Sequence, residues 1–432
     1  MSEPQRTGSK GHTRNKSSTK SRPRSSTKGP LDADDDPLTP QPSASLSPNP
    51  QAQRRSSPSP RAQRHRSPIS HVGEARAKDF SFLLKPEIYH PLTPLNVPLA
   101  FRNSSKQPSP EAPLEELLEK GHFRAAAIAA VQELTGSGAH GSVDPKDAQR
   151  IFSLLYTRLA CLTLIDATPL AAQEVKALED LNNPRLYVDE TTGRHLAPWE
   201  LRVLNVRLQA LGFGDTRRSV MSYHDLAREA RARISRAMKD HENSEIELWK
   251  ARLHELGVKV AGALVEMDDV QGAASHLSSL PSRGDNKMAL SKALLWLQLG
   301  DVGSARECTA QCSDDAGLTE KIILALCDMA DTEYEAALEK WQQLRQDTED
   351  EMVGVNAAVC LLYLGKLQEG RDILEGLVDS GLSSHTLLFN LSTMYELCTE
   401  KNRNLKMRLS EKVAAMEESS KGWEKTTADF KL

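Results

Sequence analysis

A short phrase that occurs four times in the second half of the chain constrains the fold more than any other feature. Each phrase places a turn between two helical patterns and ends on a small residue. The phrases lie at 267–273, 299–305, 330–337 and 364–370, and their closing residues are Ala273, Ala305, Ala337 and Gly370. Successive closing residues are 32, 32 and 33 positions apart. This interval, with a small residue where two helices cross, predicts helical hairpins that stack into a solenoid.

Composition agrees with this prediction. The 432 residues are 39% hydrophobic but only 5% aromatic, which suits small and aliphatic side chains packed between neighbouring helices. The length exceeds what one core usually supports, so either several domains or a repeat array is expected. A period near 34 is typical of tetratricopeptide-type hairpins. We therefore predict an all-α, tetratricopeptide-repeat-like α-solenoid, a class of fold that mostly holds other proteins.

The last two units carry the clearest pattern. Asn356 opens a run that ends at Leu364-Gly365, and Asn390, 34 positions later, opens a run that contains Tyr395. The repeat signature consists of Ala273, Gly300, Ala305, Ala337, Asn356, Gly365, Gly370, Asn390 and Tyr395. We predict irregular helical hairpins over 111–244 with a surface loop near 182–198, regular repeats over 245–416 and a frayed C-terminus over 417–432.

Residues 1–79 differ in composition from the rest of the chain. Over 1–80, Lys and Arg number 15 against 7 Asp and Glu, a net charge of +8, so the remainder of this −4 chain carries −12. With few apolar residues to offset the entropy of ordering, the tail is predicted to be disordered. It could be a solvated extension, or it could associate with an anionic membrane, at about 1 kcal/mol per Lys or Arg. No aromatic residue precedes Phe80, and no nucleic-acid partner is expected.

The tail also offers sites for phosphorylation. Five residues each precede a proline: Thr39, Ser47, Ser57, Ser59 and Ser67. Each phosphate adds about −1.5 to −2 charge at neutral pH. Phosphorylation of all five would therefore cancel the tail's positive charge.

Between the tail and the array, residues 80–110 are apolar and proline-rich. Pro86, Pro91, Pro94 and Pro98 exclude a continuous helix, so an extended docking segment is expected. It could pack along this chain's own first helices, or dock on a partner subunit. The residues predicted to dock are Phe82, Leu84, Ile88, Tyr89, Leu92 and Leu95.

No pattern in the chain indicates catalysis, and we expect no enzyme, no cofactor and no metal. Gly365-Lys366 lacks the remainder of a phosphate-binding loop, and Cys308 and Cys312 have no further ligands at metal spacing. The six cysteines are interpreted as small buried hydrophobes of a reducing compartment. No apolar run is long enough to span a bilayer and the N-terminus does not resemble a signal peptide, which predicts a cytoplasmic protein.

Two further expectations concern the helices of the array. The inner helices that begin near Asn356 and Asn390 carry no cation that could clamp a peptide carboxylate, so the two asparagines are expected to bond neighbouring helices. Trp249, Trp296 and Trp341 fall in successive units, and we expect them to be core residues.

The run from Asn356 to Leu367, followed by Leu388 to Leu397, closely resembles the C-terminus of subunit 12 of the transport protein particle (TRAPP) tethering complex. Weaker similarity reaches upstream through 248–253 to 199–204, so the likeness covers about 110–420. The resemblance implies a non-catalytic subunit of the larger TRAPP III assembly, a guanine-nucleotide exchange factor for a Rab GTPase. That assembly acts in endoplasmic reticulum-to-Golgi transport and in autophagy.

The same resemblance implies that other, small core subunits carry out the exchange, while this chain holds large peripheral subunits. It implies a peripheral location at early secretory and Golgi membranes, reached through the complex. A different reading is a stand-alone helical-repeat adaptor whose regulated basic tail associates with membranes. Deletion of the tail separates the two, because an adaptor loses its localisation and a subunit stays in the complex.

Overall fold

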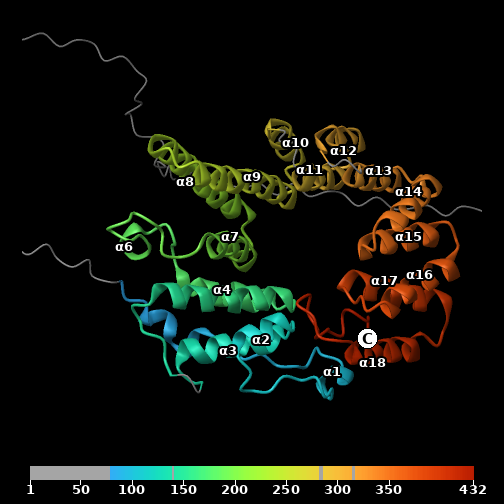
Figure 1. Cartoon of the computed structure of the whole chain (residues 1–432), viewed down its shortest axis with the longest axis horizontal. Helices are drawn as coiled ribbons and strands as arrows, with labels where there is room; N and C mark the ends of the chain where they lie inside the picture. The colour runs from blue at the N-terminus through green and yellow to red at the C-terminus, as the bar shows by residue number, and fades with distance from the viewer. Residues whose placement is uncertain (1–77, 139–140, 282–285, 314–316) are drawn as a thin grey trace, which may run out of the picture. The chain divides into compact units, whose positions relative to one another are not determined.

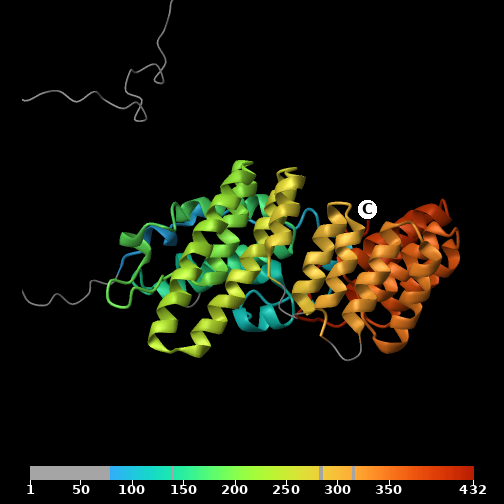
Figure 2. The ribbon, with the colours of Figure 1, turned by 90° about the horizontal axis from the view of Figure 1, so that it is seen from above.

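The structure is a computed structural model, and it describes residues 78–138, 141–281, 286–313 and 317–432. Over these ranges most helices pack against the next along the chain (Figure 1, Figure 2). The sole β-type pairing in them is an isolated bridge between Val188 and His195. The predicted all-α solenoid is confirmed. The basic tail and its five predicted phosphorylation sites lie outside the described residues.

The first part of the fold is a set of helices of unequal length, most of which pack around one core. Its aromatic centre is formed by Phe80, Phe152 and Tyr187, with the first two rings meeting edge to face at 4.9 Å between centroids. The elements are η1 (Ser81–Leu84), η2 (Pro86–Ile88), α1 (Leu99–Arg102), α2 (Leu114–Glu119), α3 (Phe123–Thr135), α4 (Ala148–Leu164), α5 (Thr168–Glu174), η3 (Val175–Leu178), α6 (Pro184–Tyr187) and α7 (Trp199–Phe213).

The segment over 80–110 forms turns, so the expectation of an extended conformation was wrong. Pro86 begins the 3₁₀-turn η2, and a proline at a first helical position loses no hydrogen bond that a helix would have made. Phe80 and Leu83 are fully buried in the first core, and the Tyr89 hydroxyl donates to the Leu83 carbonyl at 2.6 Å. The segment packs on its own chain.

A buried ion pair between α4 and α5 also binds the backbone of the 80–110 segment at His90. Arg158 of α4 donates from Nε and Nη2 to the two carboxylate oxygens of Glu174 on α5, at 2.9 and 2.6 Å. Arg158 also donates to the carbonyls of Ala127 and His90, and the His90 amide donates to Glu174 at 2.8 Å. Both charges are therefore paired and hydrogen-bonded, as burial requires.

The stretch near 182–198, predicted to be a surface loop, is exposed over 190–194 but is held on the first core by buried residues. It contains α6, and Tyr187 at the end of that helix is fully buried, with its hydroxyl donating to the Leu178 carbonyl at 2.7 Å. His195 stacks on the Tyr187 ring, with 5.9 Å between ring centroids. Most residues of this stretch are polar, so its contact with the first core through Tyr187 was not predicted.

Two long helices follow, α8 (Thr216–Asp240) and α9 (Asn243–Glu266), and they pack against each other. The Asp215 side chain caps α8 by accepting from the Arg218 amide. On its buried face α8 presents Tyr223, Leu226 and Ala230 to a core shared with α7 and α9. The alanines allow close approach of the helices.

From α9 onward the hairpins are regular. The remaining elements are α10 (Val270–Ser279), α11 (Asn286–Gln298), α12 (Val302–Glu307), η4 (Cys308–Gln311), α13 (Leu318–Ala330), α14 (Tyr334–Asp347), α15 (Glu351–Tyr363), α16 (Leu367–Asp379), α17 (His385–Cys398) and α18 (Asn402–Ala415). Two turns are capped alike: Asp269 and Asp301 each accept from the amide three residues on, at 2.9 Å. The helices thus begin where the repeated phrases predict.

The small residues that close the phrases lie at helix crossings. Ala273, Ala305 and Ala337 are fully buried. At Gly370 an added Cβ would lie 3.0 Å from the Ala358 carbonyl oxygen, so α16 approaches the backbone of α15 directly. Close approach explains why the period is marked by small side chains.

The C-terminal segment does not fray, which corrects the prediction for 417–432. Trp423 and Phe430 are buried in a core that also contains Val97 and Phe101, and the Trp423 and Phe101 rings meet at 5.3 Å. The Trp423 amide donates to the Gly121 carbonyl at 3.2 Å. We call this contact, which joins residues in and near α1 and α2 to residues 417–432, the closure contact.

Candidate functional site

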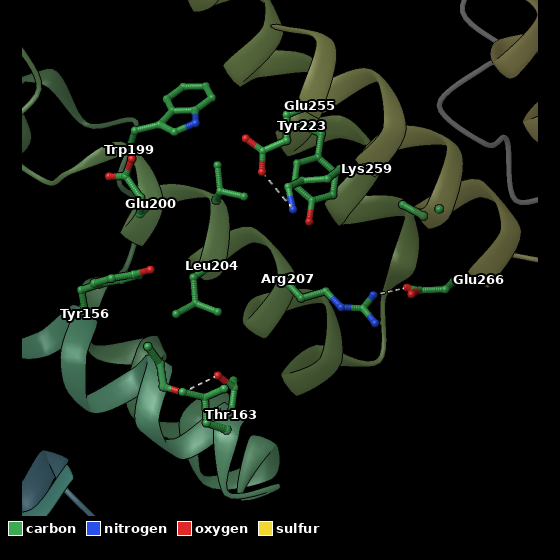
Figure 3. Close-up of a pocket in the computed structure, with 15 residues that line it drawn as sticks. Tyr156, Thr163, Trp199, Glu200, Leu204, Arg207, Tyr223, Glu255, Lys259 and Glu266 are labelled. Carbon is green, nitrogen blue, oxygen red and sulfur yellow. Dashed lines mark hydrogen bonds and ion pairs between the residues drawn. The ribbon is translucent and has the colours of Figure 1, made fainter. Parts of the chain in front are cut away.

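A hollow of about 630 Å³ lies among α4, α7, α8 and α9 (Figure 3). Figure 3 shows Tyr156 and Thr163 on α4, and Trp199, Glu200, Leu204 and Arg207 on α7. Tyr223 on α8 and Glu255, Lys259 and Glu266 on α9 complete the labelled lining. A second hollow of about 660 Å³ shares Trp199, Glu200, Glu255 and Lys259 with the first and continues along α9 to α11. We call the two together the Trp199 groove.

The groove has apolar walls and charges that are already paired. Leu164, 62% exposed, presents an aliphatic side chain at the wall of the first hollow. Lys259 lies 3.3 Å from Glu255, Arg207 pairs with Glu266, and Arg252 lies 3.7 Å from Glu200. Each of these three carboxylates has its own cation, so none of them is left unpaired for a small cation to bind. The groove suits the apolar face of a protein segment.

At the groove, Arg252 of α9 stacks on two tryptophan rings, Trp199 of α7 and Trp249 of α9. The Arg252 guanidinium lies 5.1 Å from the Trp199 ring centroid and 4.7 Å from that of Trp249, and the two rings meet edge to face at 5.4 Å. A guanidinium over an indole contributes roughly 0.5–2 kcal/mol. The Trp249 Nε1 donates to Glu245 at 2.8 Å, whereas the buried Trp199 Nε1 has no acceptor within the described residues. The stacking therefore helps to fix the position of α7 relative to α9.

No group of three or more His, Cys, Asp or Glu side chains within the described residues could hold a metal ion. Burial raises the pKa of the Tyr223 hydroxyl at the groove, so it stays protonated near neutral pH. No helix in the described part of the chain is long and apolar enough to cross a membrane.

The cysteines behave as packing residues. Cys161, Cys308, Cys327 and Cys360 are buried, and burial raises the pKa of Cys161 to about 12 and that of Cys360 to about 11. The interpretation of these four as buried small hydrophobes is confirmed by their burial. Cys312 and Cys398 are partly exposed.

Alkylation at pH 8 should therefore separate the cysteines. Because the thiolate is the reactive form, Cys161 and Cys360 should resist iodoacetamide in the folded chain while Cys398 is modified. Peptide mass spectrometry after timed quenching measures each rate, and unfolding in urea should equalise them. Equal rates at Cys161 and Cys398 in the folded chain would contradict the assignment.

The six residues predicted to dock divide into two groups. Phe82, Leu84, Tyr89 and Leu92 are half-buried against the chain's own first core, and Ile88 is half-buried on η2. Leu95 is 76% exposed, and the neighbouring Leu99 is also exposed. Docking of Leu95 on a partner stays a prediction.

The signature residues lie within the repeat helices and their turns. The two asparagines among them do not bond neighbouring helices. Asn356 donates to Met352 Sδ at 3.1 Å and Asn390 to the Thr386 carbonyl at 2.8 Å, one turn back in their own helices. That expectation was wrong because an amide can reach its own preceding turn. The remaining signature residues lie at turns or buried positions: Gly300 and Gly365 have left-handed φ, and Tyr395 donates to Glu375 at 2.9 Å.

Trp249, Trp296 and Trp341 are buried, as predicted for core residues. Sequence reasoning passed over Trp199 and Arg252 as functional candidates. The available signal was the placement of Arg252 three residues after Trp249 on one helix, where both side chains share a face. The pairing of this face with Trp199 spans 50 positions and follows no local pattern.

Fold and groove together define a helical-repeat protein of tetratricopeptide type. No family model matches the chain. The chain is similar to trafficking protein particle complex subunit 12 of mouse (Mus musculus), at 26% identity over 348 residues that cover 71% of this chain and 43% of the mouse protein. It is 27% identical to the human (Homo sapiens) protein of the same name over 350 residues, covering 71% of this chain and 47% of the human protein. The resemblance indicated by residues 356–397 is thus confirmed.

The chain spans less than half the length of these curated relatives. Among solved structures, a tetratricopeptide repeat protein from Parabacteroides merdae matches 61% of this chain and 90% of its own length, with a TM-score of 0.34 and 13% identity. The TPR domain of P58(IPK) matches 69% of this chain and 89% of its own length, with a TM-score of 0.19 and 14% identity.

Proposed function

We propose that this chain is a non-catalytic scaffold subunit of a TRAPP-type tethering complex, and that the Trp199 groove holds a helix of a larger subunit. The observation that carries the proposal is the groove itself, with apolar walls and internally paired charges. Such a surface favours the apolar face of an amphipathic helix over a small charged substrate. The similarity to subunit 12 of the trafficking protein particle complex supports the choice of complex.

We further propose that the complex is TRAPP III, the exchange factor for a Rab GTPase in endoplasmic reticulum-to-Golgi transport and autophagy. Other subunits perform nucleotide exchange, and this chain contacts the Rab protein only indirectly. Its place is the cytoplasmic side of early secretory and Golgi membranes.

Affinity capture of the tagged full chain, followed by quantitative mass spectrometry, tests both parts. Wild type should return the other TRAPP subunits at near-equal abundance. Leu164→Asp places a charge on the apolar wall of the groove and should lower their recovery about ten-fold, the scale expected of a central interface residue. The matched control is Leu397→Asp, at an exposed leucine of α17.

The outcomes separate the two claims. Absence of TRAPP subunits from the wild-type capture would overturn the choice of complex. Equal recovery with both variants would overturn the role of the groove. A stand-alone adaptor is distinguished by deleting residues 1–77, which leaves intact the hydrogen bonds from Lys78 to Glu190 and to the Arg185 carbonyl. An adaptor should lose its localisation on this deletion, and a subunit should remain in the complex.

A further inference from the structure

One exposed face of α8 carries three arginines, and none of its seven exposed positions is acidic. Seven residues, which we call the α8 stripe, are spaced alternately four and three apart and are all solvent-exposed: Arg217, Met221, His224, Arg228, Arg231, Ser235 and Met238. Since a helix turns once every 3.6 residues, this spacing aligns them on one face over roughly 30 Å. The exposure pattern therefore leaves a straight line of side chains open to a partner.

The opposite face of α8 is fully occupied. Tyr223, Leu226 and Ala230 lie in the core shared with Trp199 of α7 and Trp249 of α9. The Trp199 groove is lined from α8 by Tyr223, and none of the seven stripe residues lines it. The α8 stripe and the groove are thus separate surfaces.

Charge is segregated onto this helix. Residues 216–240 hold seven Lys and Arg against three Asp and Glu, a net of +4, whereas residues 81–432 as a whole carry −12. Exposed Arg218, Arg236 and Lys239 flank the stripe, and Asp225 beside it pairs with Arg228. The pKa of His224 is lowered, first by its partial burial and then by repulsion from His276, Arg231 and Arg228. Positive potential is therefore concentrated along the α8 stripe.

We propose that the α8 stripe is a docking surface for an anionic lipid membrane. A line of cations along an exposed helix face lines neither hollow of the Trp199 groove, so it suits an extended flat surface of negative charge better than a single enclosed ligand. Each Lys or Arg held near such a surface raises partitioning roughly five-fold. Met221, 70% exposed, and Met238 stand near the two ends of the line, where apolar tips can enter the headgroup layer.

The acidic remainder of the chain does not prevent this contact. Interactions between exposed charges fade beyond a Debye length, about 10 Å at 0.1 M salt. A helix lying along the membrane places its cations inside that distance, while most of the acidic residues of a thicker protein lie outside it. The proposal does not depend on the proposed complex, because it concerns lipid alone.

The test is co-sedimentation of the purified full chain with vesicles of 70% phosphatidylcholine and 30% phosphatidylserine. The stripe variant Arg217→Gln/Arg228→Gln/Arg231→Gln should lower partitioning at least ten-fold relative to wild type. The control variant Lys366→Gln/Arg403→Gln/Arg408→Gln removes the same charge from exposed residues elsewhere and should leave partitioning within about two-fold. Both variants keep the tail, so its contribution is common to both. Circular dichroism confirms that each is folded.

Equal partitioning of the stripe and control variants would overturn the proposal. So would binding of wild type to pure phosphatidylcholine vesicles as strong as to the anionic ones. If the stripe variant kept its vesicle binding but lost co-purifying proteins, an acidic protein surface would be the occupant and the membrane assignment would be wrong.

Discussion

Replacing Arg158 with alanine is expected to destabilise the folded chain by about 3–5 kcal/mol, among the largest effects of a single substitution in this protein. Glu174 would keep its buried carboxylate but lose the bidentate cation that now lies 2.6 Å away. The carbonyls of Ala127 and His90 would each lose a donor as well. An uncompensated buried charge costs more than the pair contributes, so most of the loss reflects the stranded Glu174.

Urea denaturation measures this loss, and hydrogen exchange locates it. The His90 amide, which donates to Glu174, should exchange faster in Arg158→Ala as the segment over 80–98 loosens. The double variant Arg158→Met/Glu174→Leu removes both charges and should recover part of the lost stability. Lys120→Ala, in an exposed pair with Glu116, should cost under about 1 kcal/mol. A loss of similar size at both sites would contradict the role of the buried pair.

The array can be predicted from the sequence because the residues that define each hairpin lie close together in the chain. Gly300 supplies a left-handed turn, Asp301 caps the next helix and Ala305 lies at the crossing, all within six positions. Each device acts within its own hairpin and recurs about one period later. The positions of the four turns marked by the repeated phrases therefore follow from the sequence with little need of tertiary information.

The surfaces could be predicted less well, because they depend on which helices meet. The basic composition of α8 is visible in the sequence, but the exposure of the α8 stripe depends on packing of the other face against α7 and α9. The Trp199 groove combines residues from α4 to α11, and no period links them. In the predicted docking segment, Phe82, Leu84, Tyr89 and Leu92 pack on the chain's own first core, whereas Leu95 and Leu99 stay exposed.

The closure contact was also hidden from the sequence. Residues 417–432 are mostly polar, so the pattern suggested fraying. Two aromatic side chains, Trp423 and Phe430, reverse that expectation because their partners lie some 300 positions earlier, at Val97 and Phe101. A hydrophobic pattern shows that a residue needs burial, but it cannot show a partner at such separation.

Trp423→Ala removes a ring from the closure contact and should lower the free energy of unfolding by about 3–5 kcal/mol, the range for truncating a buried tryptophan. The ring lies 5.3 Å from Phe101 and 5.2 Å from His122, so its loss opens a cavity between the first helices and the end of the array. Because stacked repeats stabilise mainly their neighbours, the effect should concentrate at the two joined ends. Hydrogen exchange should show lost protection in α1–α3 and in α17–α18, with α13 and α14 nearly unchanged.

The variant Trp423→Phe keeps an aromatic ring and so separates the loss of packing from the loss of the indole N–H. The Trp423 Nε1 is buried and has no acceptor within the described residues, so Trp423→Phe removes an unsatisfied donor along with some ring volume. The two changes oppose each other, and this variant should cost less than about 1.5 kcal/mol. If Trp423→Ala loosened residues 417–432 while α1–α3 kept full protection, the closure contact would not stabilise the first helices. Because the amides of Trp423 and Thr427 donate to Gly121 and Asn96, we expect loss at both ends.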